Sequence, residues 1–377
     1  MIRILFLTRS LEAGGAEAQL VELVENIDKS RFEVSVVTFY AGGRHFERVR
    51  AIPGVRLFST DKKGRWDIAS FFLRLYRVFR ETRPQIACAY NGANVITFLY
   101  GKLFHAKTAL AILNSLMNPE NSDWLDVLQQ RLTRYFSYRC SLVISNSQAG
   151  KDEYVRQGYC AENIAVIRNG FNPDFYHRER ELGEALRAEW GVAPQHILIG
   201  VVGRLDPRKD HAMFLRAASL LVKERESVRF VCVGGRGALA YTKRMKALAI
   251  ELGLRDCLIW AEERKDMLAV YNALDISALP SFTEGIPNVL GEAMCCEVPT
   301  VTTMAGDAAY LRGDPEWVVP IGDAEGMAAC WRTLLAMSPE ERAEVGKASR
   351  LRILAEFTAA QFAYKTGTVC ESLMSEG

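Results

Sequence analysis

Short apolar segments rich in β-branched residues alternate with amphipathic helical patterns along almost the whole chain, and this alternation restricts the possible folds most strongly. Uninterrupted apolar runs of strand length, separated by helix-length segments, are typical of parallel sheets covered by helices on both faces. In the N-terminal half, such runs occupy 2–7, 32–39, 55–59, 85–90, 108–113, 141–147 and 164–170. In the C-terminal half, they occupy 196–203, 228–235, 257–261, 276–281, 299–303 and 317–322. The pattern predicts an α/β protein with two doubly wound domains.

The chain of 377 residues is long enough for two hydrophobic cores. Gly, Asn and Pro cluster at the start of the segment 168–191, which therefore predicts the connection between the domains. We expect an N-terminal domain over 1–175, a C-terminal domain over 176–355 and a closing helix over 356–377. Two such domains that face each other would form a cleft at the carboxyl ends of their strands, where ligands bind in this kind of sheet.

Composition limits the location and partners of the protein. The nine cysteines include no C-x-x-C pair, which favours reduced thiols in the cytoplasm. The N-terminal apolar run contains Arg3 and is better explained by a buried first strand than by a signal peptide, and no stretch of eighteen apolar residues predicts a membrane span. Residues 1–175 carry 23 Lys and Arg against 17 Asp and Glu, and residues 176–377 carry 24 against 28, so the halves differ in charge, +6 against −4. We expect the two halves to meet different partners, and no nucleic acid among them.

The segment SFTEGIPNVLGEAM, residues 281–294, holds two glutamates eight positions apart. The pattern predicts a helix that begins near Ile286, with Glu284 in the turn before it and Glu292 about two turns into it. Because Gly285 leaves the backbone uncovered, the helix N-terminus would be open to an anion. A carboxylate on each side of an anion site suits a ligand with central phosphates and outer hydroxyls, and nucleotide sugars have that form.

A basic turn follows the first predicted strand of the C-terminal half. In GVVGRLDPRKDHAMFL, residues 200–215, Gly203 permits a tight turn. Arg204 and Lys209 would then reach a diphosphate, one with a bidentate fork and the other with a point charge. A solvated basic loop is the alternative, but the glutamate pair in the same domain favours binding.

Two glycines, Gly14 and Gly15, follow the first predicted strand of the chain. The segment lacks the complete G-x-G-x-x-G pattern, so a nicotinamide cofactor is not indicated. The two glycines would let backbone amides approach the phosphates of a donor or the acceptor, and a plain strand-to-helix turn is the alternative.

Five motifs occur in a characteristic order: GGAE at 14–17, N-S-x5-E at 146–153, R-N-G at 168–170, G-R-L-x-P-x-K at 203–209 and E-G-x6-E at 284–292. In this order the chain resembles the retaining glycosyltransferases of family 4, over nearly its whole length. The glutamate pair together with the G-R-L-x-P-x-K turn is the specific part of the resemblance.

The resemblance implies two Rossmann-like domains around a donor cleft, the GT-B type, with the last helix crossing back to the first domain. It implies that Arg204 and Lys209 bind the diphosphate and that Glu284 binds hydroxyls of the transferred sugar, which makes these three the catalytic set. Glu292 would hold the ribose. The other donor-binding residues implied are Gly15, Gly203, Gly285, Ile286, Pro287 and Asn288.

The chemistry expected of such an enzyme is transfer of a hexosyl or N-acetylhexosaminyl group from a UDP- or GDP-sugar to a glycan or lipid-linked acceptor. The sequence contains no Asp-x-Asp pair, so we expect no metal and no other cofactor, with Arg204 and Lys209 offsetting the charge of the leaving diphosphate. The acceptor-side candidates are Gly14, Asn114 and Ser115; many relatives have a histidine where this chain has the last two. The pathway expected is synthesis of a surface polysaccharide, lipopolysaccharide, capsule or glycolipid, in the cytoplasm or at the inner face of the membrane. A catalytically silent nucleotide-sugar or glycan-binding module is the alternative.

The segment 56–83 carries eight basic residues against three acidic ones. Ile68, Phe72, Tyr76 and their neighbours fall on one helical face, which we expect to pack into the domain. Arg74, Arg77 and Arg80 lie off that face and would contact an anionic membrane surface; an ordinary packed helix with a charged outer side is the alternative.

Overall fold

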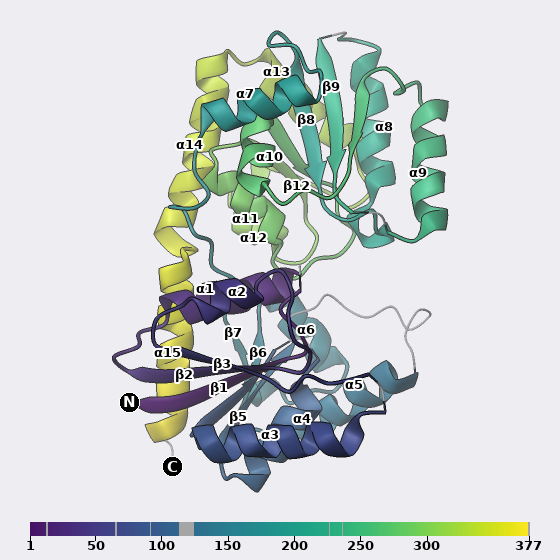
Figure 1. The fold of residues 1–377 in the computed structure, drawn as a ribbon. Helices are drawn as coiled ribbons and strands as arrows, with labels where there is room; N and C mark the ends of the chain where they lie inside the picture. The colour runs from purple at the N-terminus through teal and green to yellow at the C-terminus, as the bar shows by residue number, and fades with distance from the viewer. Residues whose placement is uncertain are drawn as a thin grey trace. The chain divides into compact units, whose positions relative to one another are not determined.

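The computed structural model describes residues 1–377 with the exception of Ala13, Arg65, Asn91, 113–123, Glu226, Arg236 and 376–377. The chain forms two compact units, the first built from Met1–Gly170 together with Ala359–Gly377 and the second from Phe171–Thr358. The closing segment of the chain is therefore part of the N-terminal unit (Figure 1).

The N-terminal unit contains one parallel sheet of seven strands in the order β3-β2-β1-β4-β5-β6-β7. Its strands are β1 (Ile2–Thr8), β2 (Phe32–Thr38), β3 (Val55–Ser59), β4 (Ile86–Ala89), β5 (Lys107–Ile112), β6 (Leu142–Ser145) and β7 (Ile164–Val166). Its helices are α1 (Gly15–Asn26), α2 (Phe46–Arg50), α3 (Ile68–Thr82), α4 (Asn94–Leu103), α5 (Trp124–Ser137), α6 (Gln148–Arg156) and α15 (Ala359–Ser375). The order of the strands reverses between β1 and β4, as in a doubly wound fold.

Alternate residues of β1 face the two cores of this sheet. Ile4 and Phe6 lie in a cluster with the apolar sides of α1, α2 and α15, whereas Leu5 and Leu7 lie in a cluster with those of α3, α4 and α5. A strand buried on both faces must be apolar at every position, which is why these strands are continuous apolar runs.

The C-terminal unit has a parallel sheet of six strands in the order β10-β9-β8-β11-β12-β13. Its strands are β8 (Ile197–Val202), β9 (Val228–Val233), β10 (Leu258–Ala261), β11 (Ile276–Leu279), β12 (Thr300–Thr303) and β13 (Val318–Val319). Its helices are α7 (Arg180–Glu189), α8 (His211–Val222), α9 (Leu239–Glu251), α10 (Met267–Ala273), α11 (Asn288–Cys295), α12 (Ala308–Arg312), α13 (Ala324–Ala336) and α14 (Pro339–Glu356). All thirteen strand segments expected from the sequence are strands, which confirms the predicted fold class of two doubly wound domains.

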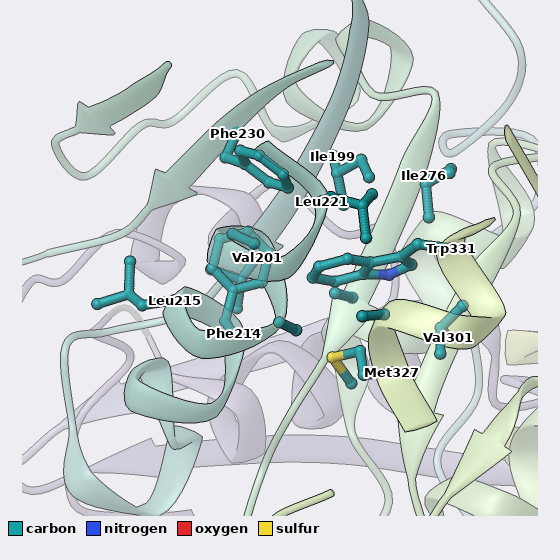
Figure 2. Packing of buried hydrophobic residues seen from close by; sticks show 14 of the residues in the cluster. Ile199, Val201, Phe214, Leu215, Leu221, Phe230, Ile276, Val301, Met327 and Trp331 are labelled. Atoms are coloured by element: carbon teal, nitrogen blue, oxygen red, sulfur yellow. The ribbon is translucent and has the colours of Figure 1, made fainter. Parts of the chain in front are cut away.

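The larger core of the C-terminal unit lies under α8 and α13. The Trp331 ring of α13 makes an edge contact with Phe214 of α8, with ring centroids 5.6 Å apart, and a tilted contact with Phe230 of β9 at 6.0 Å (Figure 2). Such aromatic contacts stabilise a core by about 0.5–1.5 kcal/mol each beyond the burial of their area. They hold α8 against β8 and β9, whose following loops form part of the candidate site.

Helix α3 corrects the prediction for its apolar face. Phe71, Leu75 and Phe79 are buried as expected, but Ile68 is 52% exposed and Tyr76 is 40% exposed. The apolar side of α3 is wider than the surface that the sheet can cover, so its outer residues remain in solvent. Among the described residues, no helix is both long and apolar enough to cross a bilayer.

Candidate active site

The predicted donor-binding residues lie where the strand order of the C-terminal sheet reverses. β8 and β11 are neighbours in the sheet, but β8 leads into a helix on the β9 side and β11 into one on the β12 side. Their following loops must therefore separate, and ligands bind at such a point in open α/β sheets. Arg204 and Lys209 follow β8, and Glu284 follows β11. The Phe282 N–H donates to the Arg208 carbonyl at 2.8 Å, which joins the two loops.

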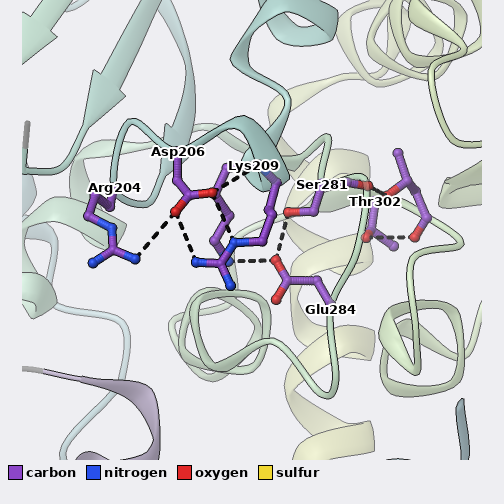
Figure 3. A network of polar contacts seen from close by, with 8 residues as sticks. Arg204, Asp206, Lys209, Ser281, Glu284 and Thr302 are labelled. Atoms are coloured by element: carbon purple, nitrogen blue, oxygen red, sulfur yellow. Dashed lines mark hydrogen bonds and ion pairs between the residues drawn. The ribbon is translucent and has the colours of Figure 1, made fainter. Parts of the chain in front are cut away.

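Lys209 and Glu284, both assigned to the catalytic set, form an ion pair (Figure 3). The Lys209 ammonium Nζ lies 2.5 Å from Glu284 Oε1, and the Ser281 hydroxyl donates to the same oxygen at 2.7 Å. The Glu284 side chain is only 11% exposed. Both contacts use Oε1, and Oε2 has no hydrogen-bond partner within the described part of the chain. One carboxylate oxygen is thus fixed by the protein, and the other is available to a hydroxyl.

Asp206 organises the remaining cations of this loop. Its carboxylate accepts from the Arg208 guanidinium at 2.9 and 3.0 Å and from Arg204 at 3.3 Å (Figure 3). The Arg208 hydrogen bonds hold the pKa of Asp206 far below its ordinary value, so this carboxylate is charged at neutral pH. Arg204 keeps a 62% exposed side chain, unlike the half-buried Lys209. Asp206 and Arg208 belong to the G-R-L-x-P-x-K turn, but the motif alone predicts no role for either residue.

The turn that carries Glu284 is supported by the loop after β12. Gly306 has φ +57°, and a Cβ there would lie 2.1 Å from the Glu284 carbonyl oxygen. The Asp307 N–H donates to the Gly285 carbonyl at 2.9 Å. The backbone at Glu284 and Gly285 is therefore held by a close approach that only glycine at 306 permits.

Helix α11 begins at Asn288, two residues later than the sequence predicts, with Pro287 as its N-cap residue. Proline at this place is compatible with φ −80°, and the chain turns into the helix only after it. Glu292 is therefore the fifth residue of α11, little more than one turn into the helix, and not two turns as expected. Ile286 is buried against Phe171 and Leu290, so its side chain belongs to the core.

Glu292 is oriented by a residue from another helix that no sequence motif indicates. The buried Tyr271 hydroxyl, from α10, donates to Glu292 Oε2 at 2.6 Å. Burial raises the pKa of Tyr271 well above its ordinary value, so the phenol remains a donor. The two residues are 21 positions apart, and no local pattern relates them; a tyrosine among small apolar residues on a short helix was the available signal.

Two glycines bring the loops after β8 and β9 into contact. Gly203 has φ +154°, and a Cβ on Gly234, after β9, would lie 2.1 Å from the Gly203 carbonyl oxygen. His211 begins α8 directly behind this loop, is fully buried, and neither ring nitrogen has a hydrogen-bond partner in the described residues. Burial lowers the pKa of His211 to about 4, so the ring is neutral at neutral pH and serves packing.

The N-terminal candidates fall into two groups. Gly14 is the N-cap residue of α1 and Gly15 its first residue. The Glu17 carboxylate reaches back so closely that a Cβ on Gly14 would lie 2.1 Å from its Oε2. This helix end therefore already carries a negative group of its own. Asn114 and Ser115 lie outside the described residues.

Within the described ranges, no group of three or more His, Cys, Asp or Glu side chains is arranged to hold a metal ion. Lys209, Arg204 and Arg208 supply positive charge at the candidate site.

Comparison with known families identifies the chain. Residues 13–175 match the family described as Glycosyltransferase Family 4, and residues 196–337 match the family described as Glycosyl transferases group 1. With its two Rossmann-like parallel sheets, the chain is a glycosyltransferase of the GT-B fold. More particularly, it belongs to glycosyltransferase family 4 by its N-terminal domain, and its C-terminal domain is of the group 1 type.

Individual relatives agree with this assignment. A Campylobacter jejuni relative is named GalNAc-alpha-(1->4)-GalNAc-alpha-(1->3)-diNAcBac-PP-undecaprenol alpha-1,4-N-acetyl-D-galactosaminyltransferase; it is 27% identical over 312 residues, 80% of this chain and 79% of that protein. The D-inositol 3-phosphate glycosyltransferase of Mycobacterium sp. (strain KMS) is 35% identical over 126 residues, 32% of this chain and 28% of that protein. Anabaena HepE, solved in complex with UDP, has a TM-score of 0.82 and 23% identity, with 98% of this chain and 100% of that chain covered.

Proposed function

We propose that this glycosyltransferase moves a hexosyl or N-acetylhexosaminyl group from a UDP- or GDP-sugar to a glycan or lipid-linked acceptor, with retention of configuration and without a metal ion. The observation that carries the proposal is the contact of Lys209 with Glu284 at the carboxyl ends of β8 and β11. An ammonium group beside a carboxylate with one available oxygen suits a phosphate next to a hydroxyl-bearing sugar.

In the proposed reaction, each charged residue of the site binds one part of the donor or offsets its developing charge. The bond between the anomeric carbon and the diphosphate oxygen breaks, and negative charge develops on the diphosphate. Lys209 and Arg204 offset that charge, which is the role expected of preorganised cations in such a site. The acceptor hydroxyl attacks from the face that the diphosphate leaves, and its proton passes to the departing phosphate. Glu284 holds hydroxyls of the transferred sugar, and Glu292, oriented by Tyr271, holds the ribose.

The names of relatives support the class of acceptor. The Campylobacter relative is named for an undecaprenol-linked glycan, which supports a lipid-linked acceptor and a part in surface polysaccharide, lipopolysaccharide, capsule or glycolipid synthesis. HepE has also been solved with UDP-glucose, so UDP-sugars are the first donors to test. The nine free cysteines support a reducing cytoplasm, and the exposed face of α3 supports peripheral contact with the inner membrane surface.

Thermal stabilisation by a panel of UDP- and GDP-sugars tests the donor. A ligand at 100 times its dissociation constant stabilises the native state by about 2.7 kcal/mol, and we expect one nucleotide sugar to do so while free sugars do not. NMR of the product made with a soluble acceptor analogue then reports the anomeric configuration. An inverted product would reject retention, and stabilisation by no nucleotide sugar would reject the proposed donor site. Donor binding without transfer to any acceptor would favour the silent binding module.

A further inference from the structure

A basic pocket lies at the amino ends of the strands of the N-terminal sheet, the edge opposite to the one that carries Gly14. It has a volume of about 470 Å3 and opens to solvent. Arg3 of β1 and Lys107 of β5 contribute to its wall, together with residues at the ends of α3 and α4. The positively charged or titratable residues among those that line it are Arg3, Arg80, Arg83, His105 and Lys107. Among the described residues, no acidic side chain lines it.

The described residues provide no acidic partner for the charges in this pocket. None of these five side chains forms an ion pair with an acidic residue in the part of the chain that the structure describes. Other arginines of the same domain do pair with glutamates, as Arg48 does with Glu25 and Arg56 with Glu81. Like charges gathered at one place raise the free energy of the folded state unless an anion offsets them. The arrangement therefore favours an anionic ligand.

The local backbone positions the basic groups but does not account for all of them. Arg83 and His105 have positive φ, 42° and 56°, and lie just beyond α3 and α4, where a basic residue interacts favourably with the helix dipole. That explanation does not apply to Arg3 and Lys107, which lie at the starts of strands. Arg3 Nε donates to the Arg83 carbonyl at 2.7 Å, so the strand and the helix end are joined beside the pocket.

Helices α3 and α4, whose ends contribute to the pocket, also carry exposed apolar side chains. Phe104, which lines the pocket, packs against Tyr76 of α3 with ring centroids 5.2 Å apart. On the outer sides of the two helices, Leu73 is 52% exposed, Leu99 49% and Leu103 61%. Figure 1 shows α3 and α4 on the same face of the sheet. Apolar side chains beside unpaired cations are the pattern of a surface that binds at a bilayer interface.

We propose that the basic pocket binds the phosphate of an anionic phospholipid headgroup while Leu73, Leu99 and Leu103 enter the interface. The proposal rests on the proposed membrane-peripheral function and gives it a defined site. A lipid is favoured over a soluble anion because a soluble anion would occupy the pocket without contacting the neighbouring leucines. The neighbouring leucines lower the free energy only when they meet an apolar phase.

The test compares vesicle binding by the wild type and by Arg83→Gln/Lys107→Gln, with phosphatidylcholine vesicles that do or do not contain phosphatidylglycerol. Each basic residue near an anionic surface contributes about 1 kcal/mol, so the double variant should bind the anionic vesicles about thirtyfold more weakly. The matched control is Arg50→Gln/Arg156→Gln, which removes the same charge from exposed arginines of the same domain that already pair with glutamates. The control should bind nearly as the wild type does. Equal losses in both variants, or none in the pocket variant, would overturn the proposal.

Two further measurements distinguish a lipid phosphate from a soluble anion and check that each variant is folded. Leu73→Ser/Leu103→Ser should weaken vesicle binding but leave binding of soluble glycerol phosphate unchanged. If the pocket variant lost glycerol phosphate binding yet bound vesicles normally, the ligand would be a soluble anion and the lipid assignment would be wrong. Donor-induced stabilisation and transfer to a soluble acceptor should be retained in every variant, which shows that the chain is folded. If the proposed donor site were wrong, the wild type itself would show neither donor-induced stabilisation nor transfer.

Discussion

At the scale of single residues, the ion pair of Lys209 with Glu284 means that neither charge acts alone. Lys209→Ala should lower turnover about a hundred- to a thousandfold and donor affinity much less, because the ammonium is needed most as the diphosphate leaves. Arg204→Ala should act in the same direction but less strongly, because its side chain is 62% exposed and solvent screens it. Steady-state kinetics measure both effects.

The pairing adds a second expectation that the same kinetics can test. Removal of Lys209 also releases Glu284, so Lys209→Ala/Glu284→Gln should lose less than the product of the two single losses. Near-native turnover of the Lys209 variant would remove Lys209 from the catalytic set, whereas strictly multiplicative losses would show that Lys209 and Glu284 act independently.

The two glutamates should differ in what they bind. Glu284→Gln should impair transfer while the nucleoside diphosphate product still binds, because the product lacks the sugar. Glu292→Gln should weaken product and donor alike, about ten- to a hundredfold, since a hydrogen bond to a charged group contributes about 1.5–3 kcal/mol. Calorimetry with both ligands resolves the two cases.

Tyr271→Phe is the matched variant for Glu292, since it removes the phenol hydrogen bond to Oε2 without changing the carboxylate. It should weaken product and donor together, by less than Glu292→Gln does. Loss of product binding in the Glu284 variant alone would show that the two roles are reversed.

The sequence predicted some of these residues and not others for a physical reason. Arg204, Lys209 and Glu284 follow strands, and the ends of neighbouring parallel strands meet at one edge, so a strand pattern is sufficient to place them together. The contact of Tyr271 with Glu292 depends on how α10 packs against α11, and the side chain of Ser281 is positioned by the turn after β11. Such contacts arise from tertiary packing and leave no periodic signal in the sequence.

At the scale of elements, the close approach of the loops after β8 and β9 is testable. Gly234→Ala places a methyl group against the Gly203 carbonyl and should displace the loop that carries Arg204 and Lys209. We expect lower stability and a fall in turnover of about a hundredfold, the loss that a displacement of about 1 Å can produce.

Gly253→Ala, at the end of α9, is the control for Gly234→Ala. Gly253 also has positive φ, +73°, but nothing lies within 4 Å of its added Cβ. The Gly253→Ala variant should therefore be destabilised by about 1 kcal/mol from backbone strain alone, and its turnover should be unchanged. Thermal unfolding and kinetics of both variants are the measurements. Equal turnover of the two variants would show that the loop contact does not position the site.

The positions of the strands could be predicted from the sequence. The start of α11 and the exposed side of α3 could be predicted less well. The strands are apolar at successive positions because both faces of the sheet are buried. The start of α11 was placed two residues early, because an N-cap proline and a first-turn proline look alike in sequence. The outer residues of α3 were expected to pack, and only the width of the underlying sheet leaves them exposed.

At the scale of the whole molecule, the two halves of the chain differ in net charge, and each gathers cations at one place. The C-terminal half of the chain, residues 176–377, has a balance of −4, and its sheet nevertheless gathers Arg204, Arg208 and Lys209 at one edge. The N-terminal domain, with a balance of +6 over residues 1–175, collects unpaired cations at the amino ends of its strands. An acidic domain that concentrates cations at one point is expected to bind an anion there and not over its whole surface.

The same charge distribution predicts how the enzyme responds to chelation. If Lys209 and Arg204 offset the charge of the leaving diphosphate, turnover should be unchanged after exhaustive treatment with EDTA, because the protein supplies the positive groups. Lys209→Ala should behave differently: millimolar Mg2+ should raise its turnover more than that of the wild type, since a metal bound to the diphosphate can replace part of the missing charge. Ser30→Ala, remote in sequence from every motif of the site and exposed, is a neutral control that should match the wild type with and without EDTA. Transfer that EDTA abolished and only a divalent cation restored would show that the metal, and not Lys209, carries this part of the reaction.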